Sequence, residues 1–280
     1  MKRLGISVVG LGRAGLARCR SIQQSDDCSI LSTYSRREDS HKKWSEILLD
    51  PLVDAVLICT ENASHAEFIE AALQANKHVA VEFPLVNQLS RAEELYALAE
   101  SKNLVLHCEF IGLLTSQHKN RKKMLQKNSW REIHCCFQGG INRWIQEEIF
   151  TGNYAQLSIG RLQSLWDLSG PLHLLEAELQ KEEQGYTLNV ICSTKEGRKV
   201  RLEEKRYPDR KRMYTWNILY DTPPLNENDF EKEGESLFLQ DLRWFTAQIR
   251  GENKGYVSIQ ECLSVLRLAE QINRTVGIVY

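Results

Sequence analysis

The sequence has no surplus of either charge, because 36 lysines and arginines face 37 aspartates and glutamates and leave a formal net charge of −1. Such a chain does not attract nucleic acid or an anionic membrane as a whole, so local basic groups must hold any anionic ligand. It also has no apolar run near the ~20 residues that span a bilayer, and the residues after Met1 do not have the pattern of a signal peptide. We therefore expect a cytoplasmic protein without a nucleic-acid or membrane partner.

Closely spaced cysteine pairs are missing as well. The eight cysteines, at positions 19, 28, 59, 108, 135, 136, 192 and 262, include no C-x-x-C motif, and several lie in apolar runs. Structural zinc sites and disulfide frameworks depend on such spacing, whereas a thiol in an apolar run behaves as a small hydrophobic group. We expect no metal site, and a reducing compartment.

Short apolar strands alternate with amphipathic helices over roughly the first 125 residues. Strands are predicted at 5–9, 30–34, 54–60, 78–82 and 104–107, and helices between them at about 64–76 and 90–102. Nearly continuous apolar strands separated by helices are typical of a parallel sheet that is covered on both faces. We therefore predict a doubly wound α/β domain over residues 1–125.

The pattern changes after about residue 128, where strand-like segments follow one another. They lie at 132–138, 187–194, 199–207 and 215–220, and one helix is predicted across 158–169. Turn signals between consecutive strands favour antiparallel pairing. We predict a second α+β domain over residues 126–280 with a large, mostly antiparallel open sheet. Its final helices, near 237–250 and 259–273, are expected to pack back toward the first domain.

A glycine-rich turn follows the first predicted strand. Gly10, Gly12 and Gly15 form the pattern G-x-G-x-x-G, with Arg13 and Ala14 at the mouth of the next helix. In dinucleotide sites the first glycine permits a tight turn, the second lets the pyrophosphate approach, and the third lets the helix pack on the strand. Three glycines can also serve a tight turn alone, but the surrounding strand and helix favour a Rossmann-type site.

The end of the second strand indicates which cofactor is preferred. An NAD enzyme places an acidic residue there to bind the ribose 2′-hydroxyl, whereas this chain has Ser35, Arg36 and Arg37, with Glu38 further around the turn. Guanidinium groups and a hydroxyl suit a 2′-phosphate. The alternative is an ordinary solvated charge pair. We predict a preference for NADPH.

Further cofactor contacts are expected where later strands end, because ligands of open α/β sheets bind outside the carboxyl ends of the strands. The candidates that follow the strand at 54–60, together with the end of the strand at 78–82, are Thr60, Glu61, Asn62, His65 and Glu82. Ser64 is expected to be the N-cap of the next helix, with Glu67 completing a capping box.

Several segments taken together resemble the Gfo/Idh/MocA oxidoreductase family, and within it the biliverdin reductase group. They are VVGLGRAG (8–15), SRRE (35–38), ENASH (61–65), QANKHV (74–79), VEFP (81–84), LHCE (106–109) and, in the second domain, SIGRL (158–162). The resemblance covers most of the chain. It implies a two-domain oxidoreductase that transfers hydride from NADPH to the central methine carbon of a linear tetrapyrrole (a bilin), a flat small-molecule substrate with two propionates.

The chain departs from the family pattern at two places. The wide family often has Glu-Lys-Pro, and its bilin-reducing members Glu-Tyr-Pro, where this chain has Glu82, Phe83 and Pro84. A phenyl ring donates no proton, which excludes the lysine mechanism of sugar-alcohol dehydrogenation but suits a flat wall beside a planar pigment. After the next strand, only His107 and Glu109 keep polar chemistry.

The resemblance also selects the residues that act on the substrate. Arg161 matches the segment that carries the reductase's key arginine, and a guanidinium with a pKa above ~12 positions and stabilises charge rather than donating a proton. Its alternative is a surface ion pair. Glu109 and His107 are the acid candidates, His107 being equally suited to a structural role, and Phe83 and Trp144 are candidate substrate contacts. For the basic run at 198–212 we favour a solvated sheet face.

Two other functions stay open on the sequence. The same architecture serves oxidoreductases that act on another small carbonyl or imine substrate, and a non-catalytic protein that binds NADPH or a bilin would share most of these motifs. The sequence leaves the choice between monomer and homodimer open.

Overall fold

The computed structural model describes residues 3–36, 42–222 and 234–277. The chain divides into two compact units, the first made of Met1–Leu114 and Glu233–Cys262 and the second of Thr115–Lys232 and Leu263–Tyr280. The sequence placed the boundary at residue 125; the structure places it at Leu114 and assigns a late segment to the first unit. The reason is that a helix of this segment completes the core of the first unit.

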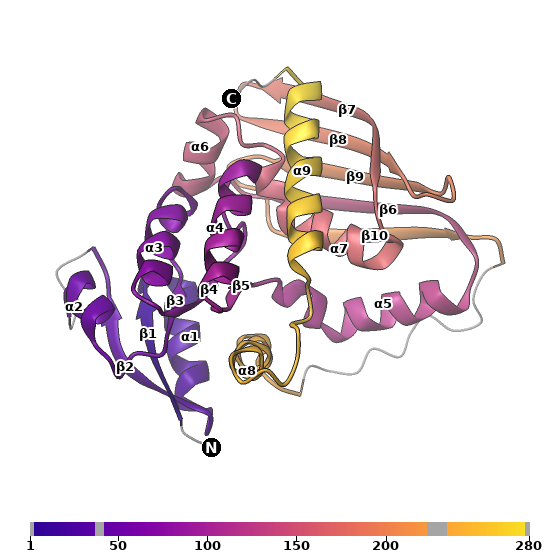
Figure 1. Ribbon diagram of the computed structural model, residues 1–280. Helices are drawn as coiled ribbons and strands as arrows, with labels where there is room; N and C mark the ends of the chain where they lie inside the picture. The colour runs from indigo at the N-terminus through magenta and orange to yellow at the C-terminus, as the bar shows by residue number, and fades with distance from the viewer. Residues whose placement is uncertain (1–2, 37–41, 223–233, 278–280) are drawn as a thin grey trace. The chain divides into compact units, whose positions relative to one another are not determined.

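The first unit is built on a parallel five-stranded sheet in the order β2-β1-β3-β4-β5. Its elements are β1 (Leu4–Val9), α1 (Arg13–Gln23), β2 (Cys28–Tyr34), α2 (Trp44–Leu49), β3 (Ala55–Ile58), α3 (Asn62–Gln74), β4 (His78–Val81), α4 (Leu89–Ser101), β5 (Leu106–Cys108), the 3₁₀ turn η1 (Ile111–Leu114) and α8 (Leu237–Ile249). Helices α3 and α4 lie side by side, as do α1 and α8 (Figure 1). The strand order reverses between β1 and β3, which is where open α/β sheets bind ligands.

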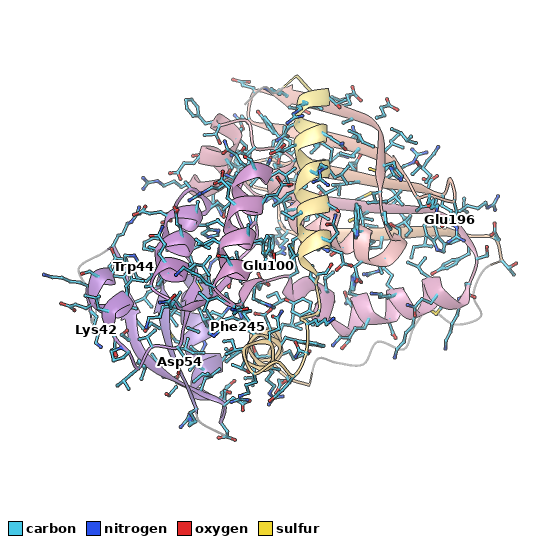
Figure 2. All side chains as sticks on the ribbon, viewed as in Figure 1. Lys42, Trp44, Asp54, Glu100, Glu196 and Phe245 are labelled. Carbon is cyan, nitrogen blue, oxygen red and sulfur yellow. The ribbon has the colours of Figure 1, made fainter. Side chains whose placement is uncertain are left out.

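Burial on both faces explains why the strands of this sheet read as continuous apolar runs. Ile6 and Val8 of β1 and Leu57 of β3 are buried in one core cluster with Leu242 and Phe245 of α8, the last of which is labelled in Figure 2. Each buried aliphatic or aromatic side chain contributes roughly 1.5–3 kcal/mol. The apolar stripe of α8 therefore binds this late helix to the first unit.

The second unit contains the second five-stranded sheet, in the order β10-β6-β9-β8-β7. Its elements are α5 (Ser116–Lys127), β6 (Trp130–Gly139), α6 (Arg143–Phe150), the 3₁₀ turn η2 (Gln156–Ser158), α7 (Ile159–Ser169), β7 (His173–Glu182), β8 (Gly185–Ser193), β9 (Lys199–Arg206), β10 (Met213–Tyr220) and most of α9 (Ile259–Thr275) (Figure 1). Among the described strands of this second sheet, only β6 and β9 pair in parallel. The predicted fold class is confirmed.

Alternation along β9 assigns its residues to two faces. Val200, Leu202, Glu204 and Arg206 are all buried, while the residues between them are partly exposed. Helix α7 packs against the buried face. A strand with one buried face normally alternates between apolar and polar residues, so the glutamate and the arginine on the buried face are unexpected.

None of the helices in the described ranges has both the length and the apolar character needed to cross a membrane.

Candidate functional site

The glycine-rich turn joins β1 to α1 at the point where the strand order reverses. Gly10 has a φ of +90°, and a Cβ there would lie 2.5 Å from the carbonyl oxygen of Cys59. A Cβ on Gly15 would collide with the carbonyl oxygen of Gly10, whereas a Cβ on Gly12 would meet no described atom within 4 Å. Gly10 and Gly15 are thus required by the fold, and Gly12 leaves open space where the pyrophosphate would approach.

The start of α1 fits a bound anion. Gly12 is the N-cap and has no side chain to accept from the first backbone N–H groups, and the first turn from Arg13, which the structure describes in full, contains no acidic residue. Arg13 is exposed and Ala14 half-buried. Uncapped N–H groups and the positive end of the helix dipole favour a phosphate at this position.

The predicted 2′-phosphate site is described in part. Ser35 and Arg36 follow β2, and Arg37 lies outside the described residues. Arg36 is 58% exposed, forms an ion pair of 3.2 Å with Glu67 of α3, and lies 5.3 Å above the ring of Phe68. That ring packs edge-on against Trp44, which is labelled in Figure 2. The guanidinium therefore rests on an aromatic base with most of its surface in solvent.

The turn after β3 differs from the expectation in one respect. Helix α3 begins at Asn62, after an exposed Glu61, so the predicted N-cap at Ser64 is wrong. The Ser64 hydroxyl instead donates to the Glu61 carbonyl at 2.9 Å and contacts the Thr60 hydroxyl at 3.0 Å. Thr60, Glu61 and Asn62 remain at the carboxyl end of β3, where the cofactor contacts are expected.

His65 is enclosed by the protein. Its side chain is fully buried, Nδ1 lies 2.9 Å from the Pro84 carbonyl oxygen, and Nε2 lies 3.1 Å from that of Thr60. Burial lowers the pKa of His65 and keeps the imidazole neutral. Its ring thus joins the turn after β3 to the segment after β4, and we assign it a positioning role rather than a direct cofactor contact.

A buried arginine links the end of β4 to α8. Arg18 of α1 is 2% exposed; its Nε donates to Glu82 at 2.9 Å and its Nη1 to Asp241 at 2.5 Å. Glu82 retains 18% exposure of its side chain. The predicted cofactor residue Glu82 is therefore oriented by Arg18, and part of its carboxylate faces solvent at the carboxyl end of the sheet.

His107 belongs to the same network. Its Nε2 lies 3.0 Å from Asp241, and its Nδ1 lies 2.6 Å from the amide oxygen of Gln248. Asp241 also accepts from the Tyr256 hydroxyl at 2.5 Å. With 4% exposure and both nitrogens within hydrogen-bond distance of protein oxygens, His107 has the surroundings of a structural histidine, which is the alternative that the sequence left open for it.

Glu109, in contrast, is held as an acid. It is 1% exposed, and burial together with the nearby Glu82 carboxylate raises its pKa well above the ordinary value, although Arg18 opposes the shift. Burial thus favours the neutral carboxyl group over the carboxylate. The next residue along the chain, Phe110, stacks its ring on that of Phe83, with centroids 5.7 Å apart and 15° between the planes.

In the second unit, Arg161 forms a buried rather than a surface ion pair. It is 6% exposed, and its Nη2 lies 2.7 Å from Glu204 of β9. Arg206 contacts the same carboxylate at 2.7 Å. Arg206 therefore departs from the solvated sheet face that we predicted for the run at 198–212.

Trp144 is the second residue of α6, and its side chain lies outside the described part of the structure.

Four of these residues were not predicted as site residues from the sequence: Arg18, Asp241, Glu204 and Arg206. The sequence does contain a signal for them, because each is a charged residue on a buried helix or strand face that is otherwise mostly apolar. Within the described ranges, no group of three or more histidine, cysteine, aspartate or glutamate side chains is arranged to hold a metal ion.

Sequence similarity identifies the protein family. The family model described as "Oxidoreductase family, NAD-binding Rossmann fold" matches residues 4–110. Biliverdin reductase A of Homo sapiens is 31% identical, over 98% of this chain and 96% of that protein. The chain belongs to the Gfo/Idh/MocA oxidoreductase family. It is accordingly an NAD(P)-dependent oxidoreductase.

Two solved structures share the whole fold. Biliverdin reductase from Synechocystis sp. PCC 6803, solved with biliverdin and NADP+, has a TM-score of 0.85 at 20% identity and covers 98% of this chain and 99% of its own. GenD2 from gentamicin A biosynthesis, solved with NAD, has a TM-score of 0.83 at 14% identity and covers 99% and 95%. At these identities the likeness shows the fold alone.

Proposed function

We propose that the chain is an NADPH-dependent reductase of a linear tetrapyrrole that converts biliverdin to bilirubin. The strongest support is the 31% identity to biliverdin reductase A, because this similarity extends over both units of the chain rather than over the cofactor unit only. When bound, NADPH supplies a hydride to the central methine carbon of the substrate, and a pyrrole nitrogen takes a proton. The protein orients the substrate and balances its charge.

The exposed guanidinium of Arg36 supports NADPH over NADH. It follows β2, the strand whose end meets the adenosine ribose in Rossmann sites, and its support on Phe68 keeps the charge directed toward solvent. A charge-assisted hydrogen bond to a 2′-phosphate contributes roughly 1.5–3 kcal/mol. Arg37 is proposed as the second basic contact, with the Ser35 hydroxyl beside it.

The stacked pair of Phe83 and Phe110 supports a planar substrate. The two rings follow β4 and β5 at the carboxyl end of the sheet. Phe110 is buried and supports the half-buried ring of Phe83, which we propose as the aromatic wall on the nicotinamide side of the cofactor site. Aromatic walls suit a flat conjugated ligand. Because Phe83 has no titratable group, the proton must come from another residue.

We assign that proton to Glu109. Its raised pKa favours the protonated form, and the Glu82 side chain, whose carboxylate contributes to that shift, is partly exposed. A buried acid beside an exposed carboxylate passes its proton outward through that carboxylate or a bound water. Arg161 stabilises the negative charge of the substrate and positions it, with Phe83 and Trp144 as further substrate contacts.

Visible spectroscopy tests this function. Purified protein is mixed with biliverdin IXα and NADPH, and we expect the red-region band to disappear while a blue-region band grows, with a lower rate for Arg161→Ala. A spectral shift on mixing without later progress would replace the reductase by a non-catalytic bilin-binding protein. No spectral change at all would favour an oxidoreductase of another small carbonyl or imine.

We also propose a cytoplasmic location, which suits eight cysteines that are all free thiols. A monomer or a homodimer is compatible with this chemistry.

A further inference from the structure

One end of the buried face of the second sheet holds more positive charge than its carboxylate neutralises. Arg161 and Arg206 are 6% and 7% exposed, and both pair with Glu204, which is fully buried. The hydroxyl of Ser158 occupies the same carboxylate. Two guanidinium groups on one carboxylate leave one positive charge without a counter-charge. A buried net positive charge is unfavourable, so this cluster favours the binding of an additional anion.

A buried hydroxyl beside this cluster lacks a partner. Tyr186 of β8 stands directly opposite Arg206 of β9 in the sheet and is 1% exposed. Its hydroxyl oxygen has no hydrogen-bond partner among the described residues. Burial and Glu204 raise the pKa of the Tyr186 hydroxyl, while Arg206 lowers it. A buried hydroxyl without a hydrogen-bond partner destabilises the fold, and a ligand atom that accepts a hydrogen bond from it would remove this penalty.

The surrounding residues hold the two guanidinium groups in place. The ring of Phe137 lies 4.3 Å from the guanidinium carbon of Arg161 and 4.6 Å from that of Arg206. Gly139 is paired with Arg206 across the sheet, and a Cβ at this position would lie 3.3 Å from the Arg206 Nη1. The glycine leaves room for the Arg206 guanidinium. The contacts with Phe137 and Glu204 hold both cations before any ligand arrives, which lowers the entropy cost of binding.

We propose that Arg206 and Tyr186, together with Arg161, bind a carboxylate of the substrate. The Arg206 guanidinium and the Tyr186 hydroxyl donate to the carboxylate oxygens, and Glu204 orients both arginines. This inference rests on the proposed function and deepens it, because a bilin presents propionate groups of this class. It makes Arg206 and Tyr186 specificity determinants for an acidic over an esterified substrate.

The first experiment compares biliverdin with its dimethyl ester. Binding of each is measured by absorbance titration on the wild type, on Arg206→Gln and on Lys205→Gln. We expect Arg206→Gln to weaken binding of the free acid by about 10- to 100-fold, the range of a charge-assisted hydrogen bond, and to leave binding of the ester unchanged. Lys205 is the matched control, since it is the neighbouring cation on the opposite face of β9, and its removal should change neither affinity.

A second variant guards against misfolding of Arg206→Gln. Tyr186→Phe removes a hydroxyl that has no partner among the described residues, so its melting temperature should equal or exceed that of the wild type. We expect it to weaken binding of the free acid several-fold and to leave the ester unaffected. Equal affinity of wild type, Tyr186→Phe and Arg206→Gln for the free acid would overturn the proposal.

Benzoate separates this site from the proposed function. At constant ionic strength, benzoate should raise the melting temperature of the wild type more than that of Arg206→Gln, and neutral benzamide should not distinguish them. This pattern in a protein that fails to reduce biliverdin would keep the carboxylate site and reject the reductase. Bilin reduction with no benzoate selectivity and no difference between acid and ester would reject the site and keep the reductase.

Discussion

Replacement of Asp241 by asparagine removes the charge at the centre of the buried network in the first unit. The carboxylate is fully buried and is contacted by Arg18 at 2.5 Å, His107 at 3.0 Å and Tyr256 at 2.5 Å. An amide oxygen can still accept one of these bonds, but the amide NH₂ meets another donor. Arg18 retains its second partner, Glu82, at 2.9 Å.

The size of the effect follows from these contacts. Removal of one partner of a buried ion pair costs about 3–5 kcal/mol, and the remaining Arg18–Glu82 pair favours the lower end. We therefore expect Asp241→Asn to lower the free energy of unfolding of the first unit by about 3 kcal/mol at pH 7. For a protein of this size, that corresponds to a decrease in melting temperature of about 6–12 °C.

The effect should also depend on pH. Burial alone would raise the pKa of Asp241, but Arg18 and His107 outweigh it and hold the pKa well below its ordinary value. A carboxylate with a lowered folded-state pKa stabilises the protein above its unfolded-state pKa of about 3.9, and the contribution is lost as the pH falls toward the folded-state value. The difference between wild type and Asp241→Asn should therefore be complete at pH 7 and shrink below about pH 4.

Urea unfolding and hydrogen exchange in α1 and α8 measure this effect. Glu94→Gln serves as the control, because it also breaks an arginine–carboxylate pair but an exposed one, with Arg91, and should change the stability by no more than about 0.5 kcal/mol. An Asp241→Asn protein within that same small margin, with unchanged exchange in both helices, would refute the buried-network account.

Three further predictions concern the cofactor unit. The folded-state pKa of Glu109 is raised, so its contribution to stability is lost as the pH rises through that value, and Glu109→Gln should become more stable than the wild type above about pH 5 in urea titrations. Because Glu67 competes with a 2′-phosphate for Arg36, Glu67→Gln should bind NADPH about 2- to 5-fold more tightly, with NADH unchanged, in fluorescence titrations. Gly12→Val should fold normally and lose cofactor binding, whereas Gly15→Val should fail to fold, as circular dichroism would show.

Each of these has an outcome that contradicts it. A pH-independent stability difference between Glu109→Gln and the wild type would mean that the pKa of Glu109 is the same in the folded and unfolded states. Equal gains for NADPH and NADH in Glu67→Gln would remove the competition for Arg36. A Gly12→Val protein that binds NADPH as tightly as the wild type would place the pyrophosphate elsewhere.

Most of the fold could be predicted from the sequence because local patterns determine it. Strands buried on both faces read as apolar runs, so β1, β3 and β4 were found within a few residues of their observed ends. Strand β7 was missed for the opposite reason. It is an edge strand with mostly exposed, glutamate-rich positions, and charged edges are common because they block pairing with other chains.

The site was predictable only where one segment carries the signal. Gly10, Gly12 and Gly15 act through a single turn, and the structure gives each the space that its role requires. The Arg18–Asp241 pair joins residues 223 positions apart, and no local pattern states which charges meet. The sequence does show a charged residue on each of these apolar faces. Such a residue predicts an oppositely charged buried partner, but it does not identify which residue that partner is.

Isotope transfer shows whether the nicotinamide hydride reaches the bilin. The enzyme is given biliverdin and NADPH deuterated at C4 of the nicotinamide, one sample for each of the two C4 positions, and the product is analysed by mass spectrometry and NMR. The account predicts that one of the two samples, and not the other, places a single deuterium on the central methine carbon of bilirubin. Product that carries deuterium at that carbon only when unlabelled NADPH is used in D₂O would contradict direct hydride transfer and with it the proposed reductase.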